Sequence, residues 1–504
     1  MSTEIVTYVT AVEKYTAPSS TRSTVLSRVC SFRVLLACML AWIVFLVFPK
    51  TIADPDLGWH LRNAAYFVQH LGVIHRDQFS FTTAGKPWID HEWLSELPFY
   101  FAWKLFGVRG VWLVAVLLVE TIMLGVFGLA YQQSKSAISA LLVSFLAIFL
   151  ASVSFGPRTL LFGWICLVIE LGILVRFRRG RDATWMLPPL FMLWINFHGS
   201  WIIGLTLLAV FCVCGAVEGN WGLIEARCWS QAQRKTLALV SAGSVLALFV
   251  NPYGWRLVFY PFDMAFQQKL NIENVQEWRT VDFHSPLGKI VFGIMAAGIL
   301  LQLVREQKWL LHEIMFVLVG LYAGFTYSRF LFLAAILILP LLSRNISAML
   351  PYRERPDQPW LNAAVVAGAL LSITIQFPRL SQLQKNGCEE YPCQALSYLR
   401  NFHPDGNTFN EFRWGGYLLW NTRQIPVFID SRVDVFEHHG VFADYLRVIR
   451  LQDSLQLLDK YKIKYVVFER NAPLTYLLEH TRQWNIDYQD KTTVVLEKRW
   501  SNLR

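Results

Sequence analysis

Residues 53–93 read ADPDLGWHLRNAAYFVQHLGVIHRDQFSFTTAGKPWIDHEW, directly after the first long apolar run of the chain. This stretch holds five carboxylates and four histidines, although the chain as a whole is poor in charge. An apolar run close to bilayer length, followed at once by such a polar segment, indicates a helix that leaves a membrane into a loop. We therefore work outward from this loop and take the other apolar runs as membrane spans.

The composition of the 504 residues supports a membrane protein. Hydrophobic residues make up 54% of the chain and charged residues 16%, against about 25% charged residues in soluble domains. We predict a polytopic α-helical membrane protein, because a helix needs roughly 20 apolar residues to cross a bilayer. The about 11 predicted transmembrane helices are 34–49, 108–130, 138–155, 158–175, 184–198, 200–218, 236–251, 287–304, 310–326, 328–343 and 360–377.

The distribution of basic residues predicts the orientation, because short cytoplasmic loops carry an excess of Lys and Arg. Basic residues fall in alternate loops, at Arg22, Arg28, Arg33, Lys135, Arg176, Arg178, Arg179, Arg181, Arg227, Arg234, Lys235, Arg305, Lys308, Arg344, Arg353 and Arg355. Residues 1–33 are then a cytoplasmic N-terminal tail. An odd number of spans places the first loop (50–107), the 252–286 loop and the C-terminal segment outside.

The formal charge of +10 is concentrated in the membrane part. Residues 379–504 hold 17 basic and 15 acidic residues, which leaves +8 for the remainder of the chain. This charge fits loops that face anionic lipid headgroups, so membrane lipids are expected partners and nucleic acid is not.

The sequence pattern of the chain changes at about Phe377. Residues 34–378 are predicted as the transmembrane domain and residues 379–504 as an extracytoplasmic α/β domain. In the latter, helical patterns (393–402, 441–449, 454–461 and 473–481) alternate with strand patterns (427–430, 464–470 and 492–498). Cys388 and Cys393 predict a disulfide better than a metal site, because neither a His nor a second Cys pair accompanies them.

The first loop carries two acidic clusters that are candidates for chemistry. Asp54 and Asp56 flank Pro55, and Asp90, His91 and Glu92 follow later, before a second aromatic helix (92–107). Such clusters at a membrane boundary can hold a general base, a divalent metal or both. The alternative is helix capping, since Asp56 and Asp90 each precede a helical pattern.

Three ionisable residues lie at span ends on the same predicted side as this loop. Arg158, His198 and Arg329 stand in "PRTLLFG", "WINFHGSW" and "FTYSRFLF". Ionisable groups at such depth are costly unless they are paired or face a cavity, which favours one shared functional site. The alternative is that these residues only belong to turns between spans.

The C-terminal segment adds "FNEFRWGGYLLW" and "VFIDSRVDVF". In the second, Asp430, Arg432 and Asp434 alternate, so an extended segment would place them on one face. A solvated loop is the alternative. No phosphate-binding loop, dinucleotide fingerprint, HExxH or GxSxG motif is present.

Together these motifs resemble the GT-C superfamily of integral membrane glycosyltransferases, which use polyprenyl-phosphate-linked sugars. The resemblance is carried by "DPDLGWHLR", "PWIDHEWLSE", "WINFHGSW", "NPYGWRLVFYPF" and the two C-terminal stretches, and it covers about residues 50–500. "DPDLGWHLR" is similar to the first outer loop of oligosaccharyltransferase catalytic subunits, where Arg follows Asp as Arg62 follows Asp56. "RWGGYLLW" is distantly similar to their WWDYG-type motif, but Gly415 and Gly416 replace the central acid, which leaves peptide-sequon recognition unsupported.

The resemblance implies inverting sugar transfer from a polyprenyl phosphate donor to a lipid, glycan or protein acceptor on the outer face of a bacterial inner membrane. Asp56, with Asp54 as the second candidate, acts as base, and Asp90 and Glu92 complete the acidic side. Arg158, His198 and Arg329 bind the donor phosphate. A divalent cation, Mg or Mn, has candidate ligands in Asp54, Asp56 and Glu92. The expected substrate-binding residues are His60, Arg62, His91, Trp414, Tyr417, Asp430, Arg432 and Asp434.

Two other functions fit a polytopic chain. A transporter, flippase or ligase for lipid-linked glycans predicts repeated halves with interrupted helices, and no such symmetry is visible. A noncatalytic envelope scaffold leaves the clustered carboxylates without a role.

Overall fold

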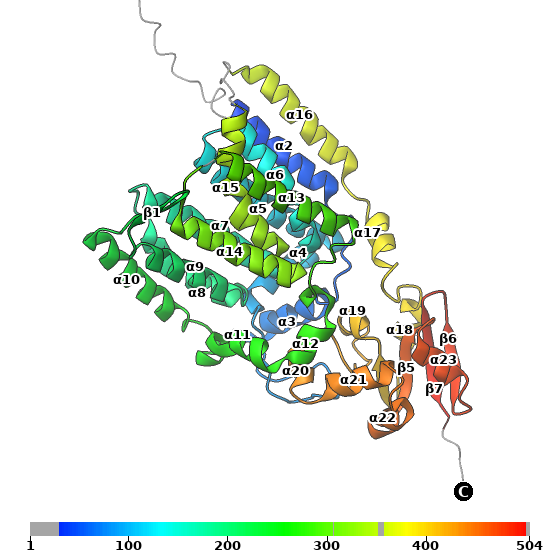
Figure 1. Ribbon diagram of the computed structural model, residues 1–504. Coiled ribbons are helices and arrows are strands. Elements are labelled where there is room, and N and C mark those ends of the chain that lie inside the picture. Colours follow the sequence, from blue (N-terminus) through cyan, green and yellow to red (C-terminus); the bar gives the residue numbers. More distant parts are fainter. Residues whose placement is uncertain (1–29, 306, 351–356, 500–504) are drawn as a thin grey trace, which may run out of the picture.

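All eleven apolar runs are helical in the computed structural model, which describes residues 30–305, 307–350 and 357–499 (Figure 1). The helices are α2 (Phe32–Val47), α5 (Val108–Ser134), α6 (Ala137–Ala151), α7 (Leu160–Arg178), α8 (Leu187–Phe197), α9 (Trp201–Cys214), α10 (Gln231–Ala247), α13 (Pro286–Arg305), α14 (Leu311–Thr326), α15 (Leu331–Met349) and α16 (Pro359–Gln376). Most of the N-terminal tail lies outside the described residues.

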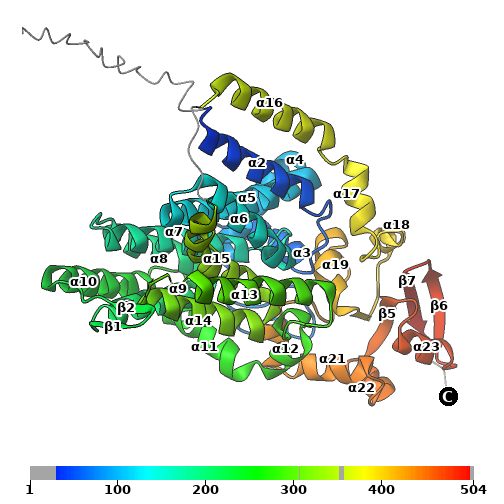
Figure 2. The same ribbon diagram turned by 45° about the horizontal axis from the view of Figure 1, so that its top comes forward.

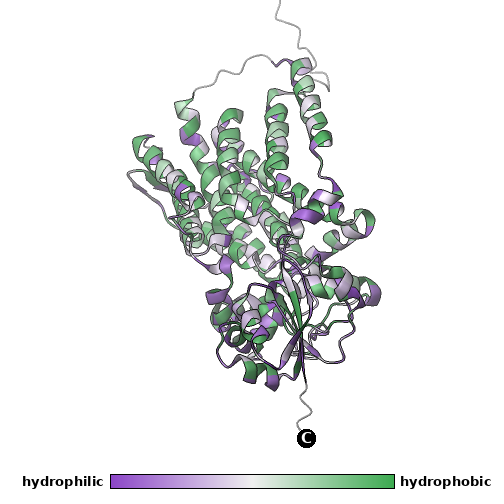
Figure 3. Ribbon diagram, turned by 90° about the vertical axis from the view of Figure 1, so that its right-hand side faces the viewer, coloured by the Kyte–Doolittle hydropathy of each residue, from purple (hydrophilic) through white to green (hydrophobic). Residues whose placement is uncertain are grey.

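Six helices in the described ranges are long and apolar enough to cross a membrane. They correspond to α5, α6, α7, α13, α15 and α16, and three further apolar helices, α2, α9 and α14, have 16, 14 and 16 residues. The total of eleven membrane crossings stays a prediction. In Figure 3 the apolar colour is concentrated in this helical body, whereas the part that carries the C-terminal sheet is mainly polar.

Helix α15 lies at the centre of the body and α16 at its edge. The apolar window of α15 is 78% buried, and the helix packs against α5, α6 and α14. The apolar window of α16 is 11% buried, and this helix lies beside α2 in Figures 1 and 2. A helix that is hydrophobic all round, such as α15, is stable only where other helices or lipid cover every side.

Four shorter helices are α3 (Leu57–His70), α4 (Trp93–Phe106), α11 (Trp255–Gln267) and α12 (Lys269–Asn274); α3 and α12 contact helices of the C-terminal residues, and α4 packs on α5 and α3. The helices predicted in the first loop are thus confirmed as α3 and α4. Helix α3 buries Trp59, Leu61 and Ala64 and ends at Leu71, which is in the left-handed conformation. The first loop therefore starts and ends on packed helices.

The C-terminal residues form a four-stranded sheet with helices around it. The strand order is β4 (Asn407–Asn410), β5 (Ile463–Glu469), β7 (Thr493–Lys498) and β6 (Trp484–Gln489). β4 and β5 are parallel and the other neighbours antiparallel, with Val466 opposite Leu496. The helices are α17 (Leu380–Gly387), α18 (Leu396–Asn401), α19 (Gly415–Asn421), α20 (Val433–Glu437), α21 (Val441–Ile449), α22 (Ser454–Lys460) and α23 (Pro473–Glu479). A separate small sheet has the order β1 (Gly219–Trp221), β2 (Ile224–Ala226) and β3 (Trp309–Leu310).

Most of the elements predicted in this part are confirmed, but the strand predicted at 427–430 is wrong. Only Val427 pairs, in an isolated bridge with Ser80 of the first loop. The backbone groups of the segment bond instead to the Asn410 side chain, which accepts from the Phe428 amide at 2.8 Å, and to the Thr82 hydroxyl, which donates to the Phe428 carbonyl at 2.6 Å. The expected extended alternation also fails, because Asp434 lies in helix α20.

The molecule has two hydrophobic cores. One fills the helical body. The other belongs to the C-terminal part and includes Trp59, Ile74 and Trp88 of the first loop. Cys388 and Cys393 form the predicted disulfide at the start of this part. The first loop is thus built into the C-terminal core.

Candidate active site

The Asp54–Asp56 segment lies where α3 begins. The Asp54 carboxylate accepts the backbone N–H of Asp56 at 2.9 Å and faces Arg158 Nε at 3.4 Å. Asp56 accepts from Trp59 Nε1 at 3.2 Å, and its side chain makes no capping hydrogen bond to the helix. The capping alternative therefore fails for Asp56, whereas Asp54 takes the turn-forming role.

Two glycines bring this segment against the C-terminal part. A Cβ on Gly58 would lie 1.9 Å from the Gly416 carbonyl oxygen, and a Cβ on Gly416 would lie 2.4 Å from that of Pro55. Helices α3 and α19 therefore touch through their backbones, which only glycine permits at this distance. The Ser431 hydroxyl adds a bridge, since it donates to the Pro55 carbonyl at 3.1 Å and accepts from Trp59 Nε1 at 3.0 Å.

The electrostatics of the pair favour a basic Asp56. Burial, together with the nearby charge of Asp54, raises the pKa of Asp56 to about 8. Burial also raises the pKa of Asp54, against the opposing charge of Arg158. Glu92 contributes to the shift at Asp56, so the two acidic clusters lie within electrostatic reach of each other.

Two arginines lie within electrostatic reach of Glu277, and one of them also pairs with Asp54. Arg158 makes ion pairs with Asp54 and with Glu277. The Arg329 guanidinium lies 4.3 Å from the centre of the Trp278 ring. Within the described ranges, Arg329 makes no ion pair and its buried Nε has no hydrogen-bond partner. Arg158 is thus already paired with two carboxylates, whereas Arg329 only helps to lower the pKa of Glu277 from a distance.

Glu92 is the centre of the second cluster. Its carboxylate lies 3.0 Å from His198 Nε2, 3.4 Å from His91 Nε2 and 3.5 Å from His60 Nε2. Although burial raises the pKa of Glu92, the two neighbouring histidines His91 and His198 hold it well below its usual range. Glu92 is therefore ionised and anchors the three rings.

The hydrogen bonds define the protonation of His198. Its Nδ1 accepts the backbone N–H of Ser200 at 2.9 Å, so this nitrogen carries no proton. The proton then sits on Nε2 and is donated to Glu92. Both nitrogens are occupied, and His198 has no donor left for a phosphate.

The remaining members of the cluster form a buried network. His60 Nδ1 lies 2.7 Å from Glu96, and Asn63 donates to both Asp90 and Glu96 at 3.3 Å. Burial lowers the pKa of His60 to about 4 and raises that of Asp90 to about 7. Asp90 also accepts the Glu92 amide at 3.2 Å, a turn-forming bond like that of Asp54, and the residue at the N-cap of α4 is Glu92, so the capping alternative fails for Asp90 as well. His60 and Asp90 therefore support Glu92 from within the protein.

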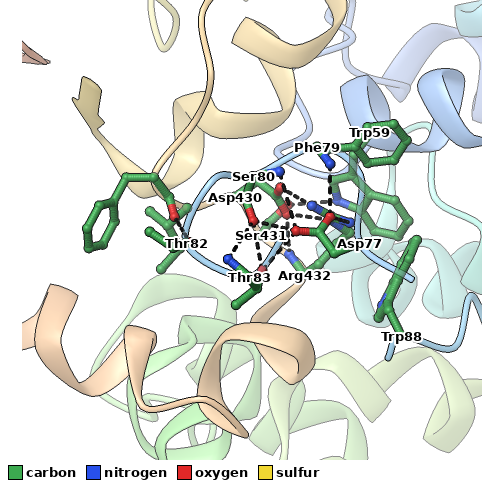
Figure 4. A network of polar contacts seen from close by, with 12 residues as sticks. Trp59, Asp77, Phe79, Ser80, Thr82, Thr83, Trp88, Asp430, Ser431 and Arg432 are labelled. Carbon is green, nitrogen blue, oxygen red and sulfur yellow. Dashed lines mark hydrogen bonds and ion pairs between the residues drawn. The ribbon is translucent and has the colours of Figure 1, made fainter. Parts of the chain in front are cut away.

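Arg432 joins the first loop to the C-terminal part (Figure 4). Its guanidinium bonds Asp430 through Nε at 2.8 Å and Nη2 at 2.6 Å, and Asp77 through Nη1 at 2.8 Å. The side chains of all three residues are at most 1% exposed. The expectation that Asp430 and Arg432 contact substrate is replaced by a structural role, because this closed group leaves no free surface.

The other predicted substrate residues are spread around the site. Asp434 accepts from Trp88 Nε1 and from the Tyr260 hydroxyl, each at 3.2 Å. Trp414 is buried and donates to the Glu390 carbonyl. The remaining two, Arg62 and Tyr417, lie respectively over the Phe79 ring and stacked on Tyr391.

Tyr417 and Asp54 line the same cavity, of ≈ 440 Å³. Its wall is mostly apolar and comes from the first loop, α5, α17 and α19, with Arg400 as a further charged residue. The predicted residues Asp54 and Tyr417 thus face one space, whereas Trp414 and Arg62 do not line it.

Comparison with known proteins gives matches only at the level of structure, since no protein-family model and no curated protein matches the chain. The oligosaccharyltransferase of Archaeoglobus fulgidus, solved with a tethered acceptor peptide that contains the NVT sequon, aligns with a TM-score of 0.54. The alignment covers 95% of this chain and 75% of that one at 12% identity. ArnT from Cupriavidus metallidurans, solved with undecaprenyl phosphate, aligns with a TM-score of 0.50 over 94% of this chain and 99% of its own, at 14% identity.

This chain has the GT-C fold. The expected resemblance is thereby confirmed for the architecture, and the chain is treated below as a multi-pass membrane protein. The likeness is distant and concerns the fold.

The predicted metal ligands do not form a metal site. The Archaeoglobus enzyme with this GT-C fold has also been solved with Zn and sulfate, at a TM-score of 0.50 over 92% of this chain and 73% of its own and 13% identity. Among residues 30–305, 307–350 and 357–499 here, no group of three or more His, Cys, Asp or Glu side chains could hold a metal ion. Asp54 is engaged by Arg158 and Glu92 by histidines, so no step below is routed through a metal.

The sequence did not single out several residues of this candidate site. Glu96 follows Glu92 at helical spacing within the quoted "PWIDHEWLSE", and this spacing was an available signal. Glu277 and Trp278 lie in the predicted outer 252–286 loop, but nothing local points to Arg158 or Arg329. Asp77 likewise gives no local sign of its bond to Arg432.

Proposed function

We propose that the chain is an inverting glycosyltransferase that moves a sugar from a polyprenyl-phosphate-linked donor to an acceptor hydroxyl on the outer face of the membrane. The observation that carries the proposal is a buried carboxylate of raised pKa, Asp56, beside Asp54 and its partner Arg158 on the GT-C fold. The undecaprenyl phosphate bound by ArnT supports the class of donor.

Asp56 is proposed as the general base. Its carboxylate has lone pairs beyond the one used by Trp59, so it can accept the acceptor's hydroxyl proton. A base works best with a pKa close to the working pH, and burial beside Asp54 raises that of Asp56 to about 8. Asp54 is proposed to keep the pKa of Asp56 raised and to hold the turn before α3 by accepting the Asp56 amide.

The acceptor oxygen then bonds to the anomeric carbon as the bond from that carbon to the phosphate oxygen breaks. The proton ends on Asp56, and the electron pair leaves with polyprenyl phosphate, which gains one negative charge. A positioned cation stabilises such developing charge. Arg329 is proposed to supply it, because Arg158 is already paired with Asp54 and Glu277.

Glu92 and its histidines are proposed as a support for this geometry. Glu92 holds His198 at the turn between α8 and α9 and His91 against the Tyr260 ring. The cavity beside Asp54 has apolar walls that fit a hydrocarbon chain. We propose that it receives the lipid portion of a substrate.

The test uses the purified full chain with a panel of radiolabelled undecaprenyl-phosphate sugars and its own membrane extract as acceptor. Asp56→Asn is expected to lower transfer by about 10²–10⁴, the usual contribution of a general base. Asp282→Asn is the matched control, because Asp282 is exposed and, within the described part of the chain, its carboxylate accepts just the His284 amide. Full activity of Asp56→Asn with any active donor would refute the proposal.

A further inference from the structure

A second cavity, of ≈ 260 Å³, lies far from Asp56 across the helical body. Helix α7 starts next to Arg158 and ends at Arg178, which lines this cavity. At 1.5 Å per residue, the helix separates the two places by about 28 Å. In Figure 2 the β1–β2 hairpin marks this end of the body, away from the C-terminal sheet.

Four arginines line this cavity: Arg178, Arg179, Arg227 and Arg344. A guanidinium has five N–H donors. The structure gives Arg178 two hydrogen bonds, both to the Arg227 carbonyl at 3.3 and 3.4 Å, and Arg179 one, to the Gln132 carbonyl at 2.5 Å. Most of their donors therefore remain available.

The acidic groups nearby leave this charge in excess. Glu313 is the one carboxylate that lines the cavity. It pairs with Arg344 at 2.8 Å and also accepts the Leu310 amide at 2.9 Å. Glu225 pairs with the exposed Arg227. In the described ranges the buried Nε of Arg344 has no hydrogen-bond partner, so a donor in the wall stays unsatisfied until an acceptor enters.

Apart from Gln133 and His312, the rest of the cavity is apolar. Leu171, Leu174, Phe211 and Leu337 contribute to its wall. Arginines at one end and leucines along the helices suit an amphiphile whose anionic head meets the guanidinium groups and whose chain follows the helices. Basic pockets between transmembrane helices on the cytoplasmic side are known to bind phosphate headgroups, and the basic loops predict that side here.

We propose that this cavity binds the phosphate headgroup of an anionic membrane lipid from the leaflet opposite the candidate active site. Free inorganic phosphate shares the headgroup chemistry but makes no use of the apolar wall. The proposal does not rest on glycosyl transfer, since the two sites share no residue.

The test measures lipid binding to the delipidated full chain by native mass spectrometry. Phosphatidylglycerol is expected to bind and phosphatidylcholine not. Two arginines near a headgroup contribute about 1 kcal/mol each, so Arg178→Gln with Arg179→Gln is expected to weaken phosphatidylglycerol binding by about tenfold or more. The matched control is Arg176→Gln with Arg305→Gln, because both are exposed, Arg176 in the last turn of α7 and Arg305 at the end of α13, and neither lines the cavity.

Equal losses in the cavity and control variants would overturn the proposal. If millimolar glycerol 3-phosphate or inorganic phosphate displaces the lipid completely, the site takes free phosphate and the lipid assignment is overturned. Arg344→Lys keeps the charge beside Glu313 and removes the guanidinium fork, so it provides the decisive variant if the double variant does not fold. Its expected result is weaker lipid binding with unchanged thermal unfolding.

Discussion

Replacing Arg432 is expected to loosen the contact between the first loop and the C-terminal part. The Arg432→Gln change leaves two buried carboxylates, those of Asp77 and Asp430, without their shared cation. Removing one partner of a fully buried ion pair costs about 3–5 kcal/mol, because the remaining charge has neither water nor a counter-ion. The side chain also lies 4.7 Å from the centre of the Trp88 ring, and this packing is lost as well.

The assay is hydrogen exchange of the full chain. If this cost appears as local opening, the protection of nearby amides falls by about two to three and a half orders of magnitude. The reporters are the amide of Phe81, which bonds the Val427 carbonyl, and that of Phe428, which bonds Asn410. Amides in the centre of α5 serve as internal reference.

Arg447→Gln is the matched control. Arg447 is 46% exposed and pairs with Asp453, which is 50% exposed, and such surface pairs contribute at most about 1 kcal/mol. A second check is the variant that combines Arg432→Met with Asp77→Asn and Asp430→Asn, which removes all three charges and is expected to recover part of the loss. The reasoning is refuted if Arg432→Gln loosens the Phe81 amide no more than Arg447→Gln does.

Three further predictions concern the candidate site. Activity is expected to rise with pH through a midpoint near 8 as Asp56 loses its proton. Asp54→Asn should move this midpoint to lower pH, because the charge of Asp54 raises the pKa of Asp56. A pH–rate profile in which the midpoint of Asp54→Asn equals that of the wild type contradicts the assignment of Asp56 as the base. Arg329→Gln should weaken undecaprenyl phosphate binding by about tenfold or more, as measured by equilibrium binding, whereas unchanged affinity would exclude Arg329 as the phosphate ligand. Glu92→Gln removes the charge that His198 faces and should lower thermal stability at neutral pH by about 3 kcal/mol or less, read as a shift in Tm beside the wild type.

The sequence predicted the helical body well because membrane spans leave a local signal. Runs such as 108–130 and 328–343 are mostly apolar, and α5 and α15 occupy most of them. Strands β5 and β7 were predictable for a similar reason, since each is a short β-branched run. The segment at 427–430 has the same appearance, but its partners are Ser80 and Asn410, which are distant in sequence.

The candidate site was predicted in its residue types and only partly in its contacts. The grouping of Arg158 and His198 with the first loop followed from counting spans, and the structure brings Arg158 to Asp54 and His198 to Glu92. The ion pairing of Arg158 and the tautomer of His198 could not be predicted, because the first depends on Glu277 and the second on the Ser200 amide. Pairing and tautomer are properties of the folded site, and no local pattern encodes them.

The contact between Gly58 and Gly416 has a consequence for how parts of chains with this fold can be recombined. The proposed base belongs to the membrane part by sequence, but it rests backbone to backbone on a helix of the C-terminal part. Grafting residues 379–504 from a relative would therefore bring a foreign surface under Asp56 and misplace it. Residues 53–93 would have to be exchanged together with the C-terminal part to keep this backbone contact.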